Sequence, residues 1–357
     1  MNFWPIASVV LGLVLLTGGA DVLVRGAVRL ARAAGIPPVV IGLTVVAIGT
    51  SMPELVVSVA AALEGRSALS LGNVVGSNIC NVLLILGASA LVAPLWVAEE
   101  VIRVELPFLL LVSAATWLAS LSGRFSRLEG MLFVLGLAGW LWMQVRTARA
   151  GKRRVKVSQE LRAEFGPQKA SHPLRLALRD ETGSAALGQA VLLDKASVTD
   201  SKPAGAEVLS GALFCLLGLV ALAGGAKLLV YGAVAVARAF SVSELTIGLT
   251  VVAVGTSLPE LATSLVASWR GQGDLAVGNI VGSNLFNLLG VLGVSAISAN
   301  GVAIPPEALR FDLPVMLLSA VICWPILRSE RMVSRAEGAA LLVGYGAYTA
   351  LLFGGGL

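Results

Sequence analysis

The chain has 357 residues, of which 57% are hydrophobic and only 13% are charged, and its formal net charge is +5. Because a soluble domain carries about twice that charged fraction, this chain cannot cover itself with polar surface. The composition therefore excludes an ordinary soluble enzyme or nucleic-acid-binding domain and predicts a multi-pass membrane protein. The basic excess is local, since residues 147–206 hold eleven Lys/Arg and six Asp/Glu.

Ten apolar segments, separated by Gly, Pro or charge, are long enough to span a bilayer, which takes about 20 residues. We predict spans at residues 6–30, 38–63, 70–92, 102–121, 127–146, 208–236, 244–268, 275–297, 311–328 and 336–354. The N-terminus runs into the first segment without a basic region, and we expect a span there and not a cleaved signal. The polar stretch 147–206 divides the spans five and five, and we expect little stable structure in it.

The basic residues of the loops predict the orientation. With the N-terminus outside, the inner loops would collect Arg25, Arg29, Arg32, Arg103, Lys152, Arg153, Arg154, Lys156, Arg270, Arg328, Arg331 and Arg335. The outer loops would hold only Arg66, Arg124, Arg127, Arg238 and Arg310. The positive-inside rule therefore favours both termini outside an inner (plasma) membrane, with the 147–206 loop in the cytoplasm.

The two halves repeat each other at a constant offset of 206 residues. Residues 42–55 read GLTVVAIGTSMPEL, and residues 248–261 read GLTVVAVGTSLPEL. Residues 72–81 read GNVVGSNICN, and residues 278–287 read GNIVGSNLFN. Because each half contains five spans, an odd number, the second half must enter the membrane from the opposite side. The sequence thus predicts an inverted-topology repeat, a common transporter construction with its site between the halves.

Glu54 and Glu260 are the repeated residues that helix packing does not explain. Small residues in membrane helices let backbones approach, which accounts for the repeated glycines. An acidic residue at a helix centre costs about 2.5–3.5 kcal/mol, so each glutamate needs a partner or a bound cation. Two ionised glutamates would match the charge of one Ca²⁺ or two Na⁺ ions.

The residues around the glutamates are rich in oxygen ligands. Pro53 and Pro259 should break their helices and free backbone carbonyls one turn earlier. Thr50 lies four residues before Glu54 and shares its helix face. Hydroxyl, amide and carboxylate oxygens without sulfur or imidazole suit hard cations such as Ca²⁺ and Na⁺.

The duplicated GTS-x-PEL and GN-x-VGSN-x-x-N blocks resemble the two alpha-repeats of the cation/Ca²⁺ exchanger superfamily, most closely its prokaryotic Na⁺/Ca²⁺ exchanger branch. The resemblance implies four cation sites in a diamond at the membrane midplane, with Glu54 and Glu260 as shared central ligands. It implies that the first and sixth spans slide against the other eight. The remaining ligands that it implies are Thr50, Thr256, Ser51, Ser257, Ser77, Ser283, Asn81 and Asn287, together with the carbonyls of Ala47 and Ala253.

Asn81 and Asn287 stand where some members of the superfamily place an aspartate in the second half. With asparagine in both halves, proton coupling and potassium dependence are less expected, and sodium coupling is favoured. Gly76 and Gly282 also fill a position where the proton-coupled branch carries an acid.

The sequence therefore predicts an all-α membrane protein with ten transmembrane helices in two inverted five-helix repeats, at residues 1–146 and 207–357, joined by a basic cytoplasmic loop at 147–206. We predict a Na⁺/Ca²⁺ antiporter, a secondary active transporter and not an enzyme. We expect no cofactor, no nucleic acid and no obligate protein partner, with Ca²⁺, Na⁺ and the lipid bilayer as its partners.

Three alternatives stay open at this point. The first is a Ca²⁺/H⁺ antiporter or an exchanger of another divalent cation. The second is an intramembrane hydrolase with Glu54 and Glu260 as an acid/base pair, which the absence of a nearby histidine or zinc motif disfavours. The third is a passive channel, which usually builds its selectivity from rings around a symmetric pore.

Overall fold

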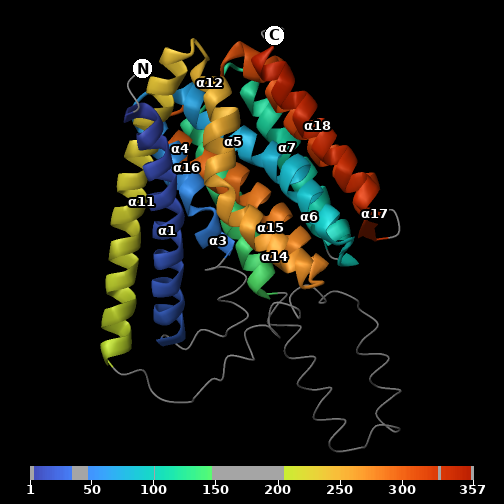
Figure 1. The fold of residues 1–357 in the computed structure, drawn as a ribbon, viewed down its shortest axis with the longest axis horizontal. Coiled ribbons are helices and arrows are strands. Elements are labelled where there is room, and N and C mark those ends of the chain that lie inside the picture. The colour runs from blue at the N-terminus through green and yellow to red at the C-terminus, as the bar shows by residue number, and fades with distance from the viewer. Residues whose placement is uncertain (1–3, 34–46, 100, 147–204, 329–330, 355–357) are drawn as a thin grey trace, which may run out of the picture.

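The computed structural model describes residues 4–33, 47–99, 101–146, 205–328 and 331–354. The expectations for the 147–206 loop, apart from its last two residues, and for the first part of the 38–63 span lie outside these residues. Figure 1 shows the described elements as a bundle of helices with both chain ends at the same end of the molecule.

The first half contains the following elements in chain order. They are α1 (Trp4–Ala33), α3 (Ala47–Thr50), α4 (Met52–Leu63), α5 (Ser67–Ile79), η2 (Cys80–Leu86), α6 (Gly87–Val92), β1 (Leu95–Trp96), η3 (Val101–Glu105), α7 (Leu106–Ser120) and β2 (Arg124–Phe125). A further apolar helix covers Arg127–Arg146. The segments named η are π-helical, with a wider turn than an α-helix.

The second half repeats most of this order. Its elements are α11 (Gly205–Ala239), α12 (Glu244–Ile247), η4 (Gly248–Val252), α13 (Ala253–Thr256), α14 (Leu258–Trp269), α15 (Gly273–Phe286), η5 (Asn287–Leu292), α16 (Gly293–Ser298), β3 (Val302–Ala303), η6 (Ala308–Asp312), α17 (Leu313–Arg328), β4 (Met332–Val333) and α18 (Arg335–Phe353).

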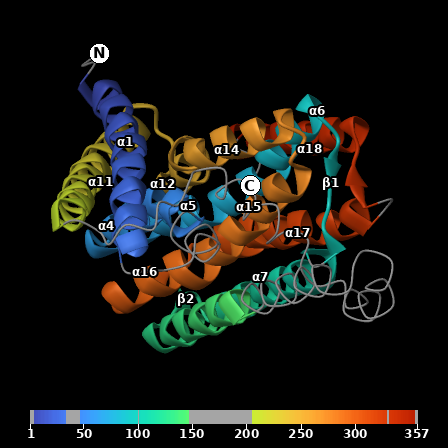
Figure 2. The same cartoon turned by 90° about the horizontal axis from the view of Figure 1, so that it is seen from below.

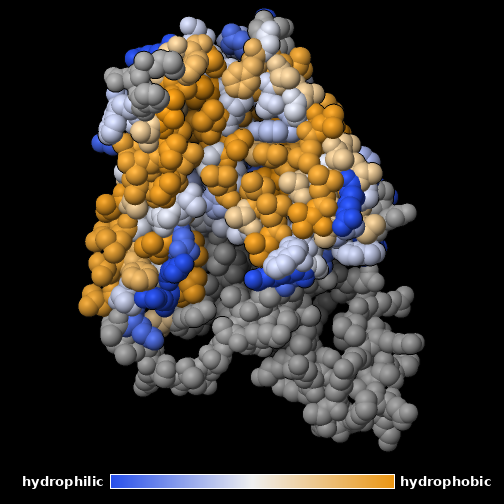
Figure 3. Space-filling model, in the orientation of Figure 1, coloured by the Kyte–Doolittle hydropathy of each residue, from blue (hydrophilic) through white to orange (hydrophobic). Residues whose placement is uncertain are grey.

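The described helices confirm a multi-pass membrane protein. Eight of them are long and apolar enough to cross a bilayer, and the bent pair Glu244–Thr256 and Leu258–Trp269 makes a ninth if it counts as one span. All nine coincide with predicted spans, and the predicted span at 38–63 is described only from Ala47 onward. The surface in view in Figure 3 is mostly apolar over these helices, as contact with lipid requires.

Two continuous helices form the centre of the molecule. In Ser67–Val92 and in Gly273–Ser298, 83% of the apolar stretch is buried, whereas only 6% is buried in Arg127–Arg146. Both central helices run from an α-helical part through a π-helical part to a second α-helical part, α5–η2–α6 and α15–η5–α16. The repeated GN-x-VGSN blocks therefore lie in the core and not at the lipid surface.

The two repeated prolines break their helices as predicted. Ser51, between α3 and α4, has φ −89° and ψ 11°, and Ser257, between α13 and α14, has φ −83° and ψ 9°. In the second half the break bends the chain by 49°. Since proline cannot donate a hydrogen bond to the residue four positions earlier, the preceding helix ends, and each glutamate lies in the first turn of a new helix.

The helices α1 and α11 pack antiparallel along one flank of the molecule, as Figures 1 and 2 show. Their contact depends on glycines at seven-residue spacing, Gly12, Gly19 and Gly26 on α1 and Gly211, Gly218, Gly225 and Gly232 on α11. A Cβ atom at Gly218 would lie 2.6 Å from Leu23 N, and one at Gly26 would lie 2.6 Å from Cys215 N. The two backbones therefore approach as closely as glycine allows.

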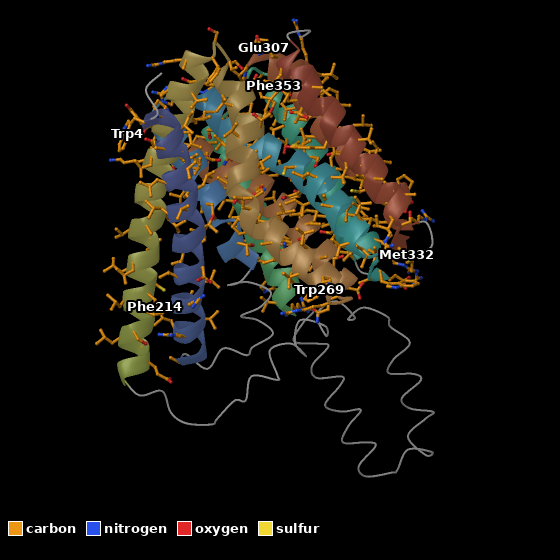
Figure 4. The ribbon with its side chains drawn as sticks, in the orientation of Figure 1. Trp4, Phe214, Trp269, Glu307, Met332 and Phe353 are labelled. Carbon is orange, nitrogen blue, oxygen red and sulfur yellow. The ribbon has the colours of Figure 1, made fainter. Side chains whose placement is uncertain are left out.

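Two short strand pairs, which the sequence did not predict, join the halves. β1 pairs antiparallel with β4, and β2 pairs antiparallel with β3. Figure 4 labels Met332 of β4 and Glu307, a few residues after β3, at opposite ends of the molecule. Each end of the described bundle thus has one short strand pair that joins the halves. We call these two pairs, β1–β4 and β2–β3, the strand clips.

A matched pair of substitutions on α11 tests the α1–α11 contact. We expect Gly218→Ala to destabilise the protein by about 1–3 kcal/mol, because the new methyl group meets backbone atoms of α1. Gly224→Ala on the same helix has no atom within 4 Å of its Cβ and should be neutral or slightly stabilising. Thermal unfolding in detergent measures both, and equal unfolding temperatures for the two variants would contradict the packing.

Candidate cation site

The two glutamates lie at the start of matching helices in the core. Glu54 is in the first turn of α4 and Glu260 is in the first turn of α14, and the exposed fraction of each is 0%. Helix α4 packs against η5, and α14 packs against η2. Each glutamate therefore lies in a helix that packs against a π-helical segment of the other half.

A crossed pair of hydrogen bonds connects the halves at the glutamates. The Ser51 hydroxyl donates to Glu260 Oε1 at 2.8 Å, and the Ser257 hydroxyl donates to Glu54 Oε1 at 2.9 Å. Both serines sit in the proline breaks and are buried. The second oxygen of each carboxylate, Oε2, is buried without a hydrogen-bond partner.

The four predicted ligands of the GSN-x-x-N blocks are also buried. Ser283 Oγ lies 3.3 Å from Ser51 Oγ, and the Ser77 hydroxyl has no partner. Asn81 and Asn287 are 0% exposed, and they lie in the π-helical segments η2 and η5. Asn81 Oδ1 and both polar atoms of Asn287 have no hydrogen-bond partner.

The other four predicted ligands are placed less directly. Thr256 donates to Asn73 Oδ1 at 3.0 Å and approaches Ala253 O at 3.2 Å. Ala253 O also accepts the Ser257 N–H at 3.0 Å, so in this structure that carbonyl already has protein partners. Thr50 ends α3 and is half-buried, and Ala47 begins the same helix.

Four asparagines and two serines of the repeated segments form a second set of polar residues that our ligand prediction missed. Asn73 donates to Ser58 Oγ at 2.8 Å and to Glu54 O at 3.3 Å, which fixes α4 against α5. The other members are Ser264, Asn78, Asn279 and Asn284. All six stand at equivalent positions of the two halves. Their repetition at the 206-residue offset is the sequence signal that could have identified them.

The unpaired oxygens give the site its chemistry. A buried polar atom without a partner costs about 1–3 kcal/mol. Here such atoms on Ser77, Asn81 and Asn287 lie in elements that pack against the helices of the two glutamates. The described residues hold no cluster of three or more His, Cys, Asp or Glu side chains able to hold a metal. Two carboxylates supplemented by hydroxyl and amide oxygens fit a hard cation and do not fit a zinc or sulfur-bound metal.

Two buried carboxylates between the halves of a multi-pass membrane bundle are an arrangement that suits a cation transporter. The chain belongs to the family described as sodium/calcium exchanger protein, whose model matches residues 4–146 and 210–354. The resemblance seen in the two repeated blocks is thereby confirmed.

Several named relatives match almost the whole chain. The putative antiporter CaxA of Alkalimonas amylolytica is 38% identical over 97% of this chain and 97% of its own length. The inner membrane protein YrbG of Escherichia coli is 36% identical over 97% of this chain and 96% of its own length. The sodium/calcium exchanger MaX1 of Methanosarcina acetivorans is 33% identical over 96% of this chain and 97% of its own length.

Solved structures of the sodium-calcium exchanger NCX_Mj share the fold. One of them, obtained after soaking with Na⁺ and Sr²⁺, has a TM-score of 0.60 and 27% sequence identity, and the match covers 99% of both chains. Another, soaked with Na⁺ and Ca²⁺, gives the same TM-score and identity.

The buried carboxylates predict that cations stabilise the fold. Calcium at about 100 times its dissociation constant should add about 2.7 kcal/mol to the free energy of unfolding, because it binds the folded state only. Glu260→Gln should lose this stabilisation, whereas Glu207→Gln on the exposed first turn of α11 should keep it. Thermal unfolding in detergent with and without calcium measures the effect, and an equal response of both variants would place the calcium elsewhere.

Proposed function

We propose that the chain is an antiporter that exchanges Ca²⁺ for Na⁺ by alternating access. The observation that carries the proposal is the crossed pairing of Ser51 with Glu260 and Ser257 with Glu54, which leaves one buried oxygen of each carboxylate unpaired. The family, and the name of its relative, the sodium/calcium exchanger MaX1, support sodium and calcium as the exchanged ions.

The proposed ligands are those that the repeated blocks predict. Glu54 and Glu260 would be shared among bound ions, with the hydroxyls, amides and carbonyls of the set above completing their coordination. If both carboxylates are ionised, their charge of −2 is balanced by one Ca²⁺ or by two Na⁺. Ions of both kinds would therefore compete for one group of oxygens, and competition produces exchange instead of leak.

We further propose the architecture of two inverted five-helix repeats, 1–146 and 207–357, joined by a cytoplasmic segment at 147–206. The order of elements supports it, because a proline break and a π-helical segment at the asparagine occur once in each half, and each half contributes one strand to each strand clip. The described antiparallel course of α1 and α11, the first helix of each half, agrees with opposite entry into the membrane (Figure 1).

The helix pair α1–α11 is the proposed moving part. Val24 of α1 lies directly over Gly49 of α3, and Leu13 of α1 lies directly over Gly255 of α13. One helix thus covers both short helices that precede the glutamates. If α1 and α11 slide together, these two apolar contacts shift together, which would open the ion site toward one side while closing it toward the other.

Transport by the purified protein tests the exchange. In sodium-loaded proteoliposomes we expect uptake of radioactive calcium that depends on the sodium gradient and persists without a pH gradient. Glu54→Gln and Glu260→Gln should reduce this uptake to that of protein-free liposomes while the variants stay folded, because the carboxylates bind the ion. Uptake driven by a pH gradient without sodium would instead establish Ca²⁺/H⁺ antiport, and flux without a counter-ion would establish a channel.

The orientation is tested by cysteine labelling in intact cells. We propose that both termini face outward, since Figure 4 places Trp269 and Met332, beside Arg270 and Arg331, at the end opposite Trp4 and Phe353. A membrane-impermeant maleimide should therefore label Glu307→Cys and leave Ala170→Cys unlabelled until the cells are opened. Labelling of Ala170→Cys from outside would reverse the orientation, and the parent protein with its three native cysteines gives the background.

A further inference from the structure

A chain of three asparagines crosses between the halves beside the proposed ion site. Asn284 of α15 donates through Nδ2 to the backbone carbonyl of Asn78 at 3.5 Å. Asn284 Oδ1 in turn accepts the Nδ2 hydrogen of Asn81 at 2.9 Å. Asn78 and Asn284 are each 2% exposed and Asn81 is 0% exposed, so no bulk water competes for these groups.

This chain of contacts fixes which end of each amide points where. An asparagine can turn its amide by half a revolution and exchange oxygen for nitrogen, and only its hydrogen-bond partners decide between the two. At Asn284 the nitrogen must face the Asn78 carbonyl, because two oxygens would repel each other. Its Oδ1 therefore faces Asn81, and Asn81 must donate a hydrogen bond to it through Nδ2.

This arrangement determines which atom of the Asn81 amide is left without a hydrogen bond. Since Nδ2 is engaged by Asn284, Oδ1 is the atom that remains, and it has no hydrogen-bond partner. Asn81 lies in η2, which packs against the helix α14 that carries Glu260. The oxygen, and not the nitrogen, is thus available to a cation among the buried carboxylates.

The repeat equivalents, Asn78 for Asn284 and Asn287 for Asn81, are arranged differently. Asn78 donates through Nδ2 to Val74 O of its own helix at 2.8 Å, and its Oδ1 has no partner. Neither polar atom of Asn287, the counterpart of Asn81, has a hydrogen-bond partner. The amide of Asn287 is therefore not oriented by its neighbours in the way that Asn81 is.

We propose that Asn284 is a positioning residue that holds the Asn81 amide with its oxygen toward the transported cation. Asn284 acts through Asn81 and does not itself bind the ion. The inference rests on the proposed cation site and goes beyond it, because it assigns a role to a residue outside the predicted ligand set. It also makes the two halves of the site unequal, with one amide ligand oriented in advance and the other not.

The competing explanation is that Asn284 only joins two buried helices, as polar residues do in many membrane bundles. The two roles separate in a background where Asn81 needs no orientation. Asn81→Asp provides it, because a carboxylate presents an oxygen whichever way it turns. A structural contact can persist in this background, because the Asn284 amide nitrogen has two hydrogens and can donate to a carboxylate at position 81. Loss of a purely structural contact would therefore weaken the protein in both backgrounds, whereas loss of an orienting contact matters only when residue 81 is an amide.

The experiment measures calcium affinity by equilibrium binding in detergent for four proteins, the parent, Asn284→Leu, Asn81→Asp and the double variant. Removing a group that orients a metal ligand typically weakens affinity 10–100-fold, so we expect Asn284→Leu to lose about ten-fold or more. In the Asn81→Asp background the same change should alter calcium affinity by less than about two-fold. If the leucine variant does not fold, Asn284→Ala, which adds no bulk, replaces it, and its calcium affinity is compared in the same two backgrounds.

Two outcomes would overturn the proposal. The first is unchanged calcium affinity in Asn284→Leu, and the second is an equal loss with asparagine and with aspartate at position 81. Glu54→Gln distinguishes this failure from failure of the cation site itself. If the parent and Glu54→Gln bind calcium equally, the site is wrong, whereas loss of binding in Glu54→Gln with either of the two outcomes above rejects only the role of Asn284.

Discussion

The structure depends on keeping two carboxylates, Glu54 and Glu260, away from both water and basic side chains. Each receives one hydrogen bond, from the break serine of the other half, and each keeps one buried oxygen without a partner. Isolated acids at membrane depth are costly, and that cost is recovered when a cation binds. Because both halves must meet for either bond to form, the same contact that assembles the fold also assembles the proposed ion site.

The local backbone explains how the carboxylates reach this position. Pro53 and Pro259 end one helix and start another, so Ser51 and Ser257 lie in breaks where their hydroxyls can cross to the opposite half. The π-helical segments add an extra residue to the turn at Asn81 and Asn287, a feature that recurs at functional sites. Close approach of α5 to η4 is possible because Gly76 has no side chain, and a Cβ there would lie 2.5 Å from Leu249 O.

Much of this was predictable because the repeat supplies the same information twice. Hydropathy gave the spans, and proline chemistry gave the helix breaks at Ser51 and Ser257. The π-helical turns and the strand clips were not predictable, since they arise from packing between halves and leave no periodic pattern in a local sequence. The orienting asparagines were visible as repeated residues, but their hydrogen bonds depend on which helix faces which, and spacing alone does not give that.

The repeat also explains why the site need not be symmetric. Equal sequences place Asn78 and Asn284 at equivalent positions, yet Asn284 bonds across to the other half and Asn78 bonds within its own helix. Under the proposed alternating-access mechanism the protein adopts two states that differ in which half is open, and in the proposed inverted repeat each state exchanges the environments of the halves. A bonding pattern that differs between equivalent asparagines is therefore what a single state of such a transporter should contain. By this reasoning the opposite state would release Asn81 and engage Asn287 with Asn78, so that the amide ligand held ready for the cation changes from one half to the other during the cycle.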